Sequence, residues 1–352
     1  MKPLRIAGPA ILLACALLFP WLFPDPSVTT IAIFTFLFAG AAIGWNLFSG
    51  YTGYISLGHA AFYGLGAYTL ALVCKAWTIP GGYIPLLFLP LAGLIAGLFA
   101  VPMGWIALRT RRHTFVVITI AMFYVFQLLA YNLAGITNGS AGIYLPNPPW
   151  SADVFNVPFY YVSLSLLLMA LGVSWWIRHS KFGLGLLAIR DDEDRALSLG
   201  VRTGASKMGA YVLSAVFAGI VGALHAYYIG NIYPSFAFDP VFDISVALMA
   251  FLGGVGTLSG PLLGAIVLEP LQQYLTLQYG GNGVDLFIYG ILFLVVILLL
   301  PVGVVPTLRQ QWTHVRARMH LLSPSQLNGR LASMENPEIR HLPQDGHQKE
   351  HV

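Results

Sequence analysis

Charged residues are scarce in this sequence. Asp, Glu, Lys and Arg make up 9% of its 352 residues, whereas hydrophobic residues make up 57% and the mean hydropathy is +0.74. A soluble globular domain carries roughly 25% charged residues, because most of its surface faces water. A deficit this large excludes a soluble protein of ordinary composition. It predicts an all-α, polytopic membrane protein with much of its surface in contact with lipid.

Cysteines and catalytic motifs are also scarce. Cys15 and Cys74 are the only cysteines and both lie in apolar segments, so neither a disulfide framework nor a zinc site is expected. No phosphate-binding loop of the G-x-x-x-x-G-K-(S/T) type, no H-E-x-x-H and no C-x-x-C occurs. We therefore expect a chain that is not an enzyme and that binds no metal or cofactor itself.

Long apolar runs divide the chain into candidate spans. A membrane-spanning helix needs about 20 mostly apolar residues. The N-terminal run lacks a small-residue cleavage site, which predicts that it is retained as the first helix. One segment is short enough to be a half-helix, so about ten spans are predicted, with a range of eight to ten. The segments are 6–24, 28–48, 55–74, 84–108, 114–134, 158–178, 206–230, 242–256 (the short one), 259–278 and 284–304.

Lysine and arginine indicate the orientation. Loops on the cytoplasmic side of a membrane collect these residues. With the N-terminus inside and ten spans, only Lys75 among the 18 basic residues falls outside. Both termini are therefore predicted to be cytoplasmic, and the pI of about 9.0 reflects topology rather than nucleic-acid binding. We expect a transmembrane domain over residues 1–320 and a polar, disordered cytoplasmic tail over 321–352.

One predicted cytoplasmic loop concentrates charge of both signs. Its sequence is FGLGLLAIRDDEDRALSLGVRTGASK, residues 182–207. Asp191 or Asp192 is well placed to cap a short helix, and Gly200 to follow its C-terminus. This helix carries an apolar strip that includes Leu197, and it is too short to be stable alone in water. From the residues alone, a solvated loop and a docking element for a soluble partner remain open.

Four sequence blocks, in order along the chain, carry a family resemblance. They are SGYTGYISLGHAAFYGLGAYTLAL (49–72), ITNGSAGI (136–143), GLGLLAIRDDEDRALSLGVRTGASKMGAYVLSAVFAGIVGAL (183–224) and VALMAFLGGVGTLSGPLLGAIVLEPL (246–271). Together they resemble the branched-chain amino acid permeases of bacterial ABC importers, of the LivM type, over most of the chain. The resemblance implies the ABC importer permease fold and a place in the bacterial inner (cytoplasmic) membrane.

The resemblance also implies partners. ATP-binding cassette subunits would hydrolyse ATP and dock on a coupling helix at about 184–200. A periplasmic substrate-binding protein would deliver the solute, a homologous second permease of the LivH type would complete the pathway, and membrane lipid would surround both. The implied coupling residues are Arg190, Asp191, Asp192, Glu193, Leu197 and Gly200.

Polar side chains within the predicted spans are candidates for lining a solute path. Ser56, His59 and Tyr63 follow helical spacing and are expected to share one face. For His59 a hydrogen bond between packed helices is favoured over a place on the path, and for Glu269 pairing with a helix neighbour is favoured. Glycines can break a helix so that its backbone faces a cavity. The candidate path residues are Asn46, Ser56, His59, Tyr63 and Glu269, and the candidate helix breaks are Gly53, Gly58, Gly253, Gly254 and Gly256.

The resemblance implies import of branched-chain amino acids across the inner membrane. Urea or short-chain amides are the alternative solutes, because their importers use very similar permeases. An ion-coupled secondary transporter fits less well, since Glu269 is the one carboxylate predicted clearly within a span and the charged loop would have no role. A membrane-embedded enzyme would need a constellation of His, Asp and Glu with metal spacing, which the sequence lacks.

Overall fold

The computed structural model describes residues 13–23, 25–152, 154–279 and some positions between 287 and 307. Most of the predicted span at 284–304 and the predicted tail at 321–352 therefore lie outside the described residues. So does the first half of the predicted span at 6–24, whose described part is a short helix, Leu13–Leu22.

The described chain is almost entirely helical, as its composition predicts. Two short strands, β1 (Ile143–Tyr144) and β2 (Asn231–Ile232), pair antiparallel with Ile143 opposite Ile232. The longer helices are α2 (Pro26–Trp45), α3 (His59–Ala76), α5 (Leu89–Ala107), α6 (Arg112–Asn132), α8 (Asn156–Arg178), α9 (Lys181–Asp191), α11 (Thr203–Ile229), α13 (Pro240–Gly253) and α14 (Gly260–Tyr279). The shorter ones are η1 (Asn46–Gly50, π-helical), α4 (Ile84–Leu87), α7 (Ala134–Thr137), η2 (Gly139–Ala141), α10 (Glu193–Ser198) and α12 (Pro234–Ala237).

Six helices in the described part of the chain are long and apolar enough to cross a membrane. This number does not reach the ten spans predicted. α3 and α14 match two further predicted segments but carry polar side chains such as His59 and Glu269. The predicted short segment at 242–256 is in fact preceded by α12, and the two together form one apolar stretch of 20 residues. The six are Pro26–Gly50, Leu89–Ala107, Arg112–Asn132, Asn156–Arg178, Thr203–Ile229 and Pro234–Gly253.

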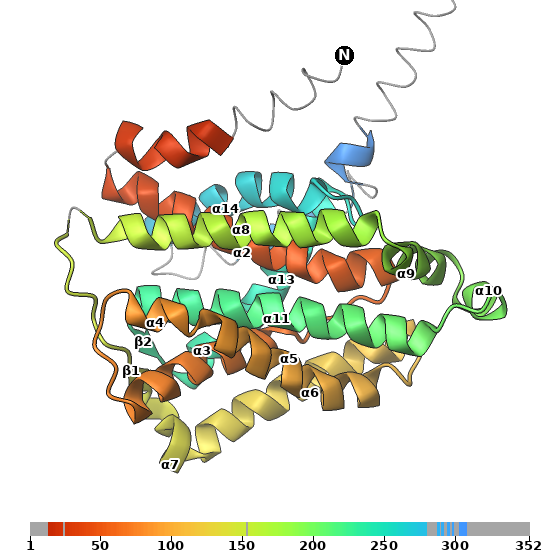
Figure 1. Ribbon diagram of the computed structural model, residues 1–352, viewed down its shortest axis with the longest axis horizontal. Helices are drawn as coiled ribbons and strands as arrows, with labels where there is room; N and C mark the ends of the chain where they lie inside the picture. Colours follow the sequence, from red (N-terminus) through yellow and green to blue (C-terminus); the bar gives the residue numbers. More distant parts are fainter. Residues whose placement is uncertain are drawn as a thin grey trace, which may run out of the picture. The chain divides into compact units, whose positions relative to one another are not determined.

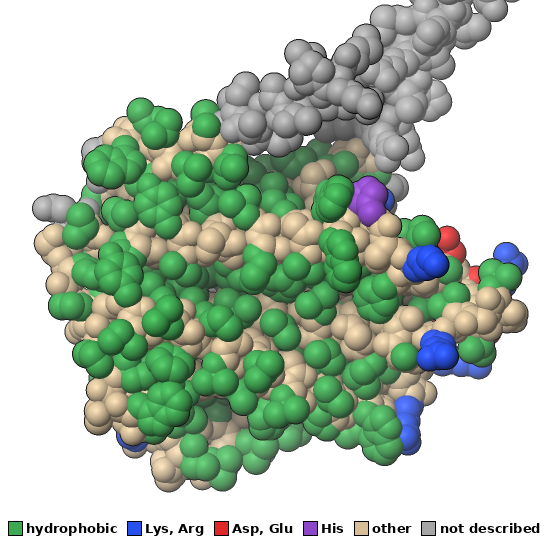
Figure 2. Space-filling view, in the orientation of Figure 1, with side chains coloured by type: hydrophobic (Ala, Val, Ile, Leu, Met, Phe, Trp, Pro, Cys, Tyr) green, Lys and Arg blue, Asp and Glu red, His purple; other side chains and the backbone are tan. Residues whose placement is uncertain are grey.

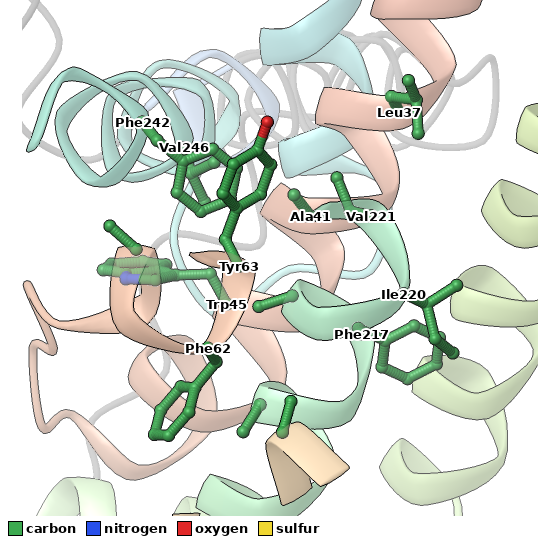
Figure 3. Close-up of a cluster of buried hydrophobic side chains, with 14 of the residues drawn as sticks. Leu37, Ala41, Trp45, Phe62, Tyr63, Phe217, Ile220, Val221, Phe242 and Val246 are labelled. Carbon is green, nitrogen blue, oxygen red and sulfur yellow. The ribbon is translucent and has the colours of Figure 1, made fainter. Parts of the chain in front are cut away.

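α11 is the central helix of the bundle. It packs along α3, α5 and α2, while α2 also packs against α8, and α13 packs against α14 (Figure 1). Aromatic and branched side chains from α2, α3, α11 and α13 fill the space between these helices (Figure 3). The cluster includes Leu37, Trp45, Phe62, Tyr63, Phe217, Val221, Phe242 and Val246.

Small residues bring α3 and α11 close together. A Cβ atom placed on Gly66 of α3 would collide with the backbone of Gly219 in α11, and one placed on Gly222 would collide with the backbone of Tyr63. Close approach through glycine is a common device in membrane helices, because van der Waals contact replaces the hydrophobic driving force that lipid cannot supply. The glycine-rich 49–72 and 183–224 blocks thus meet at this helix contact.

Charged side chains gather at one end of the bundle. α9 and α10 lie at this end, whereas the β1–β2 ladder, α4 and α7 lie at the other (Figure 1). Most Lys and Arg side chains visible in Figure 2 lie at the α9–α10 end, and hydrophobic side chains are spread over the rest of that face. A surface of this kind suits lipid around the helices and water at the charged end.

Replacing Gly66 by alanine is expected to lower the stability of the bundle by about 1–3 kcal/mol, because the added methyl group forces α3 and α11 apart. Gly172→Ala is the matched control, since Gly172 is an exposed glycine in the middle of α8 with no atom within 4 Å of a Cβ built there. Thermal unfolding in detergent measures both variants. Equal melting temperatures for the two would contradict the close contact.

Candidate functional site

The first helix interruption follows α2. The end of α2 widens into η1, and helical structure stops at Thr52. Residues 53–58 are non-helical, and α3 begins at His59. Gly53 has a φ of +74°, a conformation that other residues adopt only with strain, and Gly58 is the N-cap residue of α3. π-Helical turns are frequent at functional sites, which directs attention to this interruption.

The second helix interruption separates α13 from α14. α13 ends at Gly253, residues 254–259 are non-helical, and α14 begins at Gly260. Gly254 and Gly256 have φ values of +119° and +77°. Both glycines therefore take up backbone conformations that a Cβ would disfavour.

The buried side chain of Asn46 joins the two interruptions. Its Nδ2 donates to the carbonyl oxygen of Thr257 at 2.9 Å, and its Oδ1 accepts from the backbone N–H of Gly256 at 2.7 Å. Asn46 is fully buried in η1. Both polar groups of its amide are hydrogen-bonded. Asn46 therefore holds the second interruption against η1, the helix that precedes the first interruption.

Two arginines tie the charged end of the bundle to the same interruptions. Nη1 of Arg190, in α9, donates to the carbonyl oxygen of Gly50 at 2.9 Å and reaches that of Val255 at 3.4 Å. Arg178, the last residue of α8, donates to the carbonyl oxygen of Gly256. Charged donors make stronger hydrogen bonds than neutral ones. These contacts hydrogen-bond α9 and the end of α8 to the interrupted helices.

A third arginine fixes the end of α9. Nη2 of Arg112, in the first turn of α6, donates to the carbonyl oxygens of Ile189 and Arg190 at 2.9 and 2.8 Å. Helix C-termini leave such carbonyls without intrahelical partners. The guanidinium of Arg112 also lies 5.8 Å from the centre of the Tyr54 ring, which brings α6 and the first interruption to the same place.

Glu193, Lys207 and Tyr54 meet beside Arg112. We call these four residues the charged junction. Glu193 begins α10 and accepts from Lys207 Nζ and from the Tyr54 hydroxyl, both at 2.5 Å. Burial opposes ionisation of Glu193, but the hydrogen bonds from Lys207 and Tyr54 outweigh it and hold the pKa of Glu193 below its usual value. Burial and the hydrogen bond to Glu193 raise the pKa of Tyr54, so its hydroxyl stays a donor.

α10 projects beyond the junction. Asp192 is its N-cap and accepts from the backbone N–H of Arg195, and Gly200 follows its end with a φ of +85°. The short capped helix predicted from the sequence is therefore present. Leu197 is 60% exposed and Leu199 is 82% exposed, so α10 carries apolar side chains that nothing in the described chain covers.

A buried polar cluster surrounds the first turn of α3. His59 Nε2 lies 2.5 Å from Ser214 Oγ of α11, and Asp243 Oδ1 of α13 accepts from the backbone N–H of Ala60 at 3.1 Å. A carboxylate suits this position because a helix N-terminus carries partial positive charge. Ser56 precedes the helix, so the expectation that it shares a helix face with His59 and Tyr63 is wrong.

The remaining predicted path residues have partners of their own. The Tyr63 hydroxyl contacts Nδ1 of His225 in α11. Glu269 accepts from Gln273, one turn later in α14, at 2.9 Å. Together with Asn46, which is held by the second interruption, they are not brought into the cluster around Ser56 and His59.

Sequence reasoning missed several residues of the junction and the cluster. Arg112, Arg178 and Lys207 were counted only as topology signals, although a cation at the start or end of a long apolar helix is a candidate for a buried contact. Tyr211 was not singled out at all. Asp243 is 2% exposed and packs against the first turn of α3.

A family model now decides the relationship. The model of the permease component of branched-chain amino acid transport systems matches residues 27–297. The chain belongs to this family. The matched range contains both interruptions, the charged junction and the polar cluster, so these features lie within the part of the chain that defines a permease. No solved structure matches the chain.

Characterised relatives agree with the family model. High-affinity branched-chain amino acid transport system permease protein LivM of Salmonella typhimurium is 29% identical over 333 residues, which cover 85% of this chain and 75% of that protein. The LivH permease protein of the same system and organism is 26% identical over 286 residues, covering 76% of this chain and 90% of LivH. The autoinducer 2 import system permease protein LsrC of Yersinia pseudotuberculosis is 26% identical over 268 residues, 72% of each chain.

Acid is expected to weaken the junction of this permease. Because the folded-state pKa of Glu193 is below its ordinary value of 4.5, its contribution to stability is fully present above that value and is lost as the pH falls through the folded pKa. Glu193→Gln removes this part of the acid dependence. Asp191→Asn, at an exposed carboxylate that ends α9, is the control and keeps it. Thermal unfolding in detergent between about pH 6 and 3 makes the comparison, and identical profiles for wild type and Glu193→Gln would contradict the role of the ion pair.

Proposed function

We propose that this chain is the permease subunit of a bacterial ABC importer that moves branched-chain amino acids across the inner membrane. Family membership over residues 27–297 and the LivM and LivH relatives support this function. The proposal assigns ATP hydrolysis to separate ATP-binding cassette subunits and no cofactor to this chain.

The charged end of the bundle is proposed to face the cytoplasm, and both termini of the chain are proposed to be cytoplasmic. Apart from Lys75, the basic residues of the described chain lie between the end of α5 and the first turn of α6, or between the end of α8 and the second turn of α11. Positive residues favour the cytoplasmic side. A periplasmic binding protein would then meet the opposite end, which carries the β1–β2 ladder.

α10 is proposed as the coupling helix on which an ATPase subunit docks. Leu197 and Leu199 are exposed beside Asp192 and Arg195, which form an exposed ion pair at 3.0 Å. Apolar side chains rimmed by charges of both signs suit a protein partner, because the charges set the register of the complex. The hydrogen bonds of Arg190 support this mechanism most directly, since they connect α9 to backbone carbonyls at both helix interruptions.

A second permease of the LivH type is the proposed partner within the membrane. The chain is related to LivM and to LivH alike, as expected if two homologous permeases build one pathway. Ser56 and His59 are proposed to line that pathway in this chain. Asn46, Tyr63 and Glu269, all buried or partnered, would hold the surrounding helices in place.

The solute is tested by uptake into proteoliposomes that contain the whole importer. Labelled leucine, urea and autoinducer 2 are the probes, the last because a relative belongs to an autoinducer 2 import system. We expect ATP-dependent uptake of leucine alone. Uptake of urea instead of leucine would show that urea is the solute. Uptake by vesicles that lack the ATPase subunits would show that the chain is a secondary transporter and not part of an ABC importer.

Coupling is tested in the same vesicles with Arg190→Ala. Loss of its charged hydrogen bonds to the interruptions, worth about 1.5–3 kcal/mol each, is expected to lower leucine uptake more than about tenfold while the ATPase subunits still hydrolyse ATP. Arg109→Ala is the control, because Arg109 lies at the same end of the bundle but stacks on Trp105, 3.6 Å away. Equal uptake by both variants would contradict the proposed coupling route.

A further inference from the structure

Four polar atoms around the first turn of α3 are buried and have no hydrogen-bond partner. They are Ser56 Oγ, His59 Nδ1, Tyr211 Oη and Asp243 Oδ2. Their residues are between 0% and 2% exposed. A buried polar group without a partner costs roughly 1–3 kcal/mol, so a folded protein rarely keeps several together unless water or a ligand satisfies them.

These atoms belong to one place in the bundle. The rings of His59 and Tyr211 meet edge to face with centroids 6.1 Å apart. The Tyr211 hydroxyl interacts with the Ser56 hydroxyl, although the two do not meet hydrogen-bond geometry, and it lies near the Asp243 carboxylate. Asp243 is in turn bound to the first turn of α3 through Ala60. Three separate elements and the first interruption thus bring these residues together around the first turn of α3.

The region lies within the transmembrane part of the bundle. Ser214, which binds His59, stands near the middle of α11, a helix of 27 residues. A helix of this length extends about 40 Å, enough to cross the hydrocarbon core. Polar groups at such depth face the bundle interior or an aqueous cavity.

The chemistry of the four atoms favours a cationic, multi-donor nitrogen. An ionised Asp243 can only accept at Oδ2, and the hydroxyls of Ser56 and Tyr211 can rotate to accept as well. The positive end of the α3 dipole, which elsewhere receives a solute carboxylate, is already occupied by Asp243 Oδ1. With Asp243 ionised, the cluster presents negative charge where an interrupted helix alone would present positive charge.

We propose that this polar cluster binds the ammonium group of the solute during translocation, with Asp243 as its counter-ion. The inference rests on the proposed function and adds to it the residues Tyr211 and Asp243 and the part of the solute, its protonated amine, that the cluster holds. A solute carboxylate or an inorganic anion is disfavoured at this position because Asp243 repels it.

The test uses a cysteine as a reporter in the assembled importer. Ser56→Cys is made in a chain in which Cys15 and Cys74 are replaced by serine and alanine, and modification is measured in proteoliposomes during ATP turnover. The probes are the cationic 2-aminoethyl and the anionic 2-sulfonatoethyl methanethiosulfonates, with rates normalised to those of a free thiol. We expect the cationic reagent to react at least about tenfold faster, equivalent to about 1.4 kcal/mol.

Two variants assign the preference. Asp243→Asn keeps an oxygen that can accept from the Ala60 N–H, and it is expected to abolish the preference for the cationic reagent. Tyr211→Phe is expected to keep this preference but to reduce the degree to which a bound amine slows modification. Ser163→Cys is the matched control, since Ser163 is a fully buried serine of α8 that donates to Tyr160 of its own helix, and it stays unmodified. Thermal unfolding of each variant separates a folding defect from a binding defect.

Protection identifies the group that binds. 3-Methylbutylamine, which is leucine without its carboxylate, is expected to slow modification of Ser56→Cys, and 4-methylpentanoate, which lacks the amine, is not. Any of three results would overturn the proposal: equal rates for the two reagents, a preference that survives Asp243→Asn, or no modification at all. The last result means that the cluster holds only water. The reagent preference does not depend on leucine as solute, so failure of leucine uptake in wild-type vesicles is a separate result that bears on the proposed function alone.

Discussion

Backbone carbonyls that lose their helical partners at the two interruptions must find other donors, and this requirement shapes the rest of the site. In a membrane protein an unsatisfied backbone group costs several kcal/mol, because lipid offers no hydrogen bonds. The side chains of Arg178, Arg190 and Asn46 supply donors to Gly256, Gly50 and the following residues. Arginine is suited to this task, since its planar guanidinium carries five donors and stays charged.

The same contacts explain why a chain so poor in charge keeps charged residues together. A guanidinium that reaches into the bundle to satisfy carbonyls must come from an element close to water, and α9 and the end of α8 are such elements. Movement of α9 then cannot leave the interruptions unchanged, because it would break hydrogen bonds made by Arg190. Energy applied at α10 would therefore reach the interrupted helices through a few named bonds and not through the bundle as a whole.

Much of this arrangement is predictable from the sequence, and the limits have physical causes. Apolar runs predict the helices, and an acid before EDRALS with a glycine after it predicts α10, because caps act over a single turn. The prediction made from helical spacing is wrong at Ser56, because periodicity assumes that the helix continues through a glycine-rich stretch. Contacts such as Arg178 with Gly256 or Tyr211 beside Ser56 join residues more than 70 positions apart, and local patterns carry no information about which distant segments meet.

The two polar sites of the bundle obey one rule with opposite results. At the charged junction, and at Asn46 between the two interruptions, donors and acceptors are matched: Glu193 accepts from two partners and Asn46 uses both ends of its amide, which favours a single rigid geometry. At the first turn of α3 they are unmatched, with Asp243 holding one oxygen free. A rigid, fully hydrogen-bonded site can transmit movement between helices. Polar groups without partners are stabilised only when a polar ligand or water binds to them. The two sites approach each other at the first interruption, where Tyr54 belongs to the matched site and Ser56 to the unmatched one, so the proposed roles of coupling and binding fall on separate sets of residues.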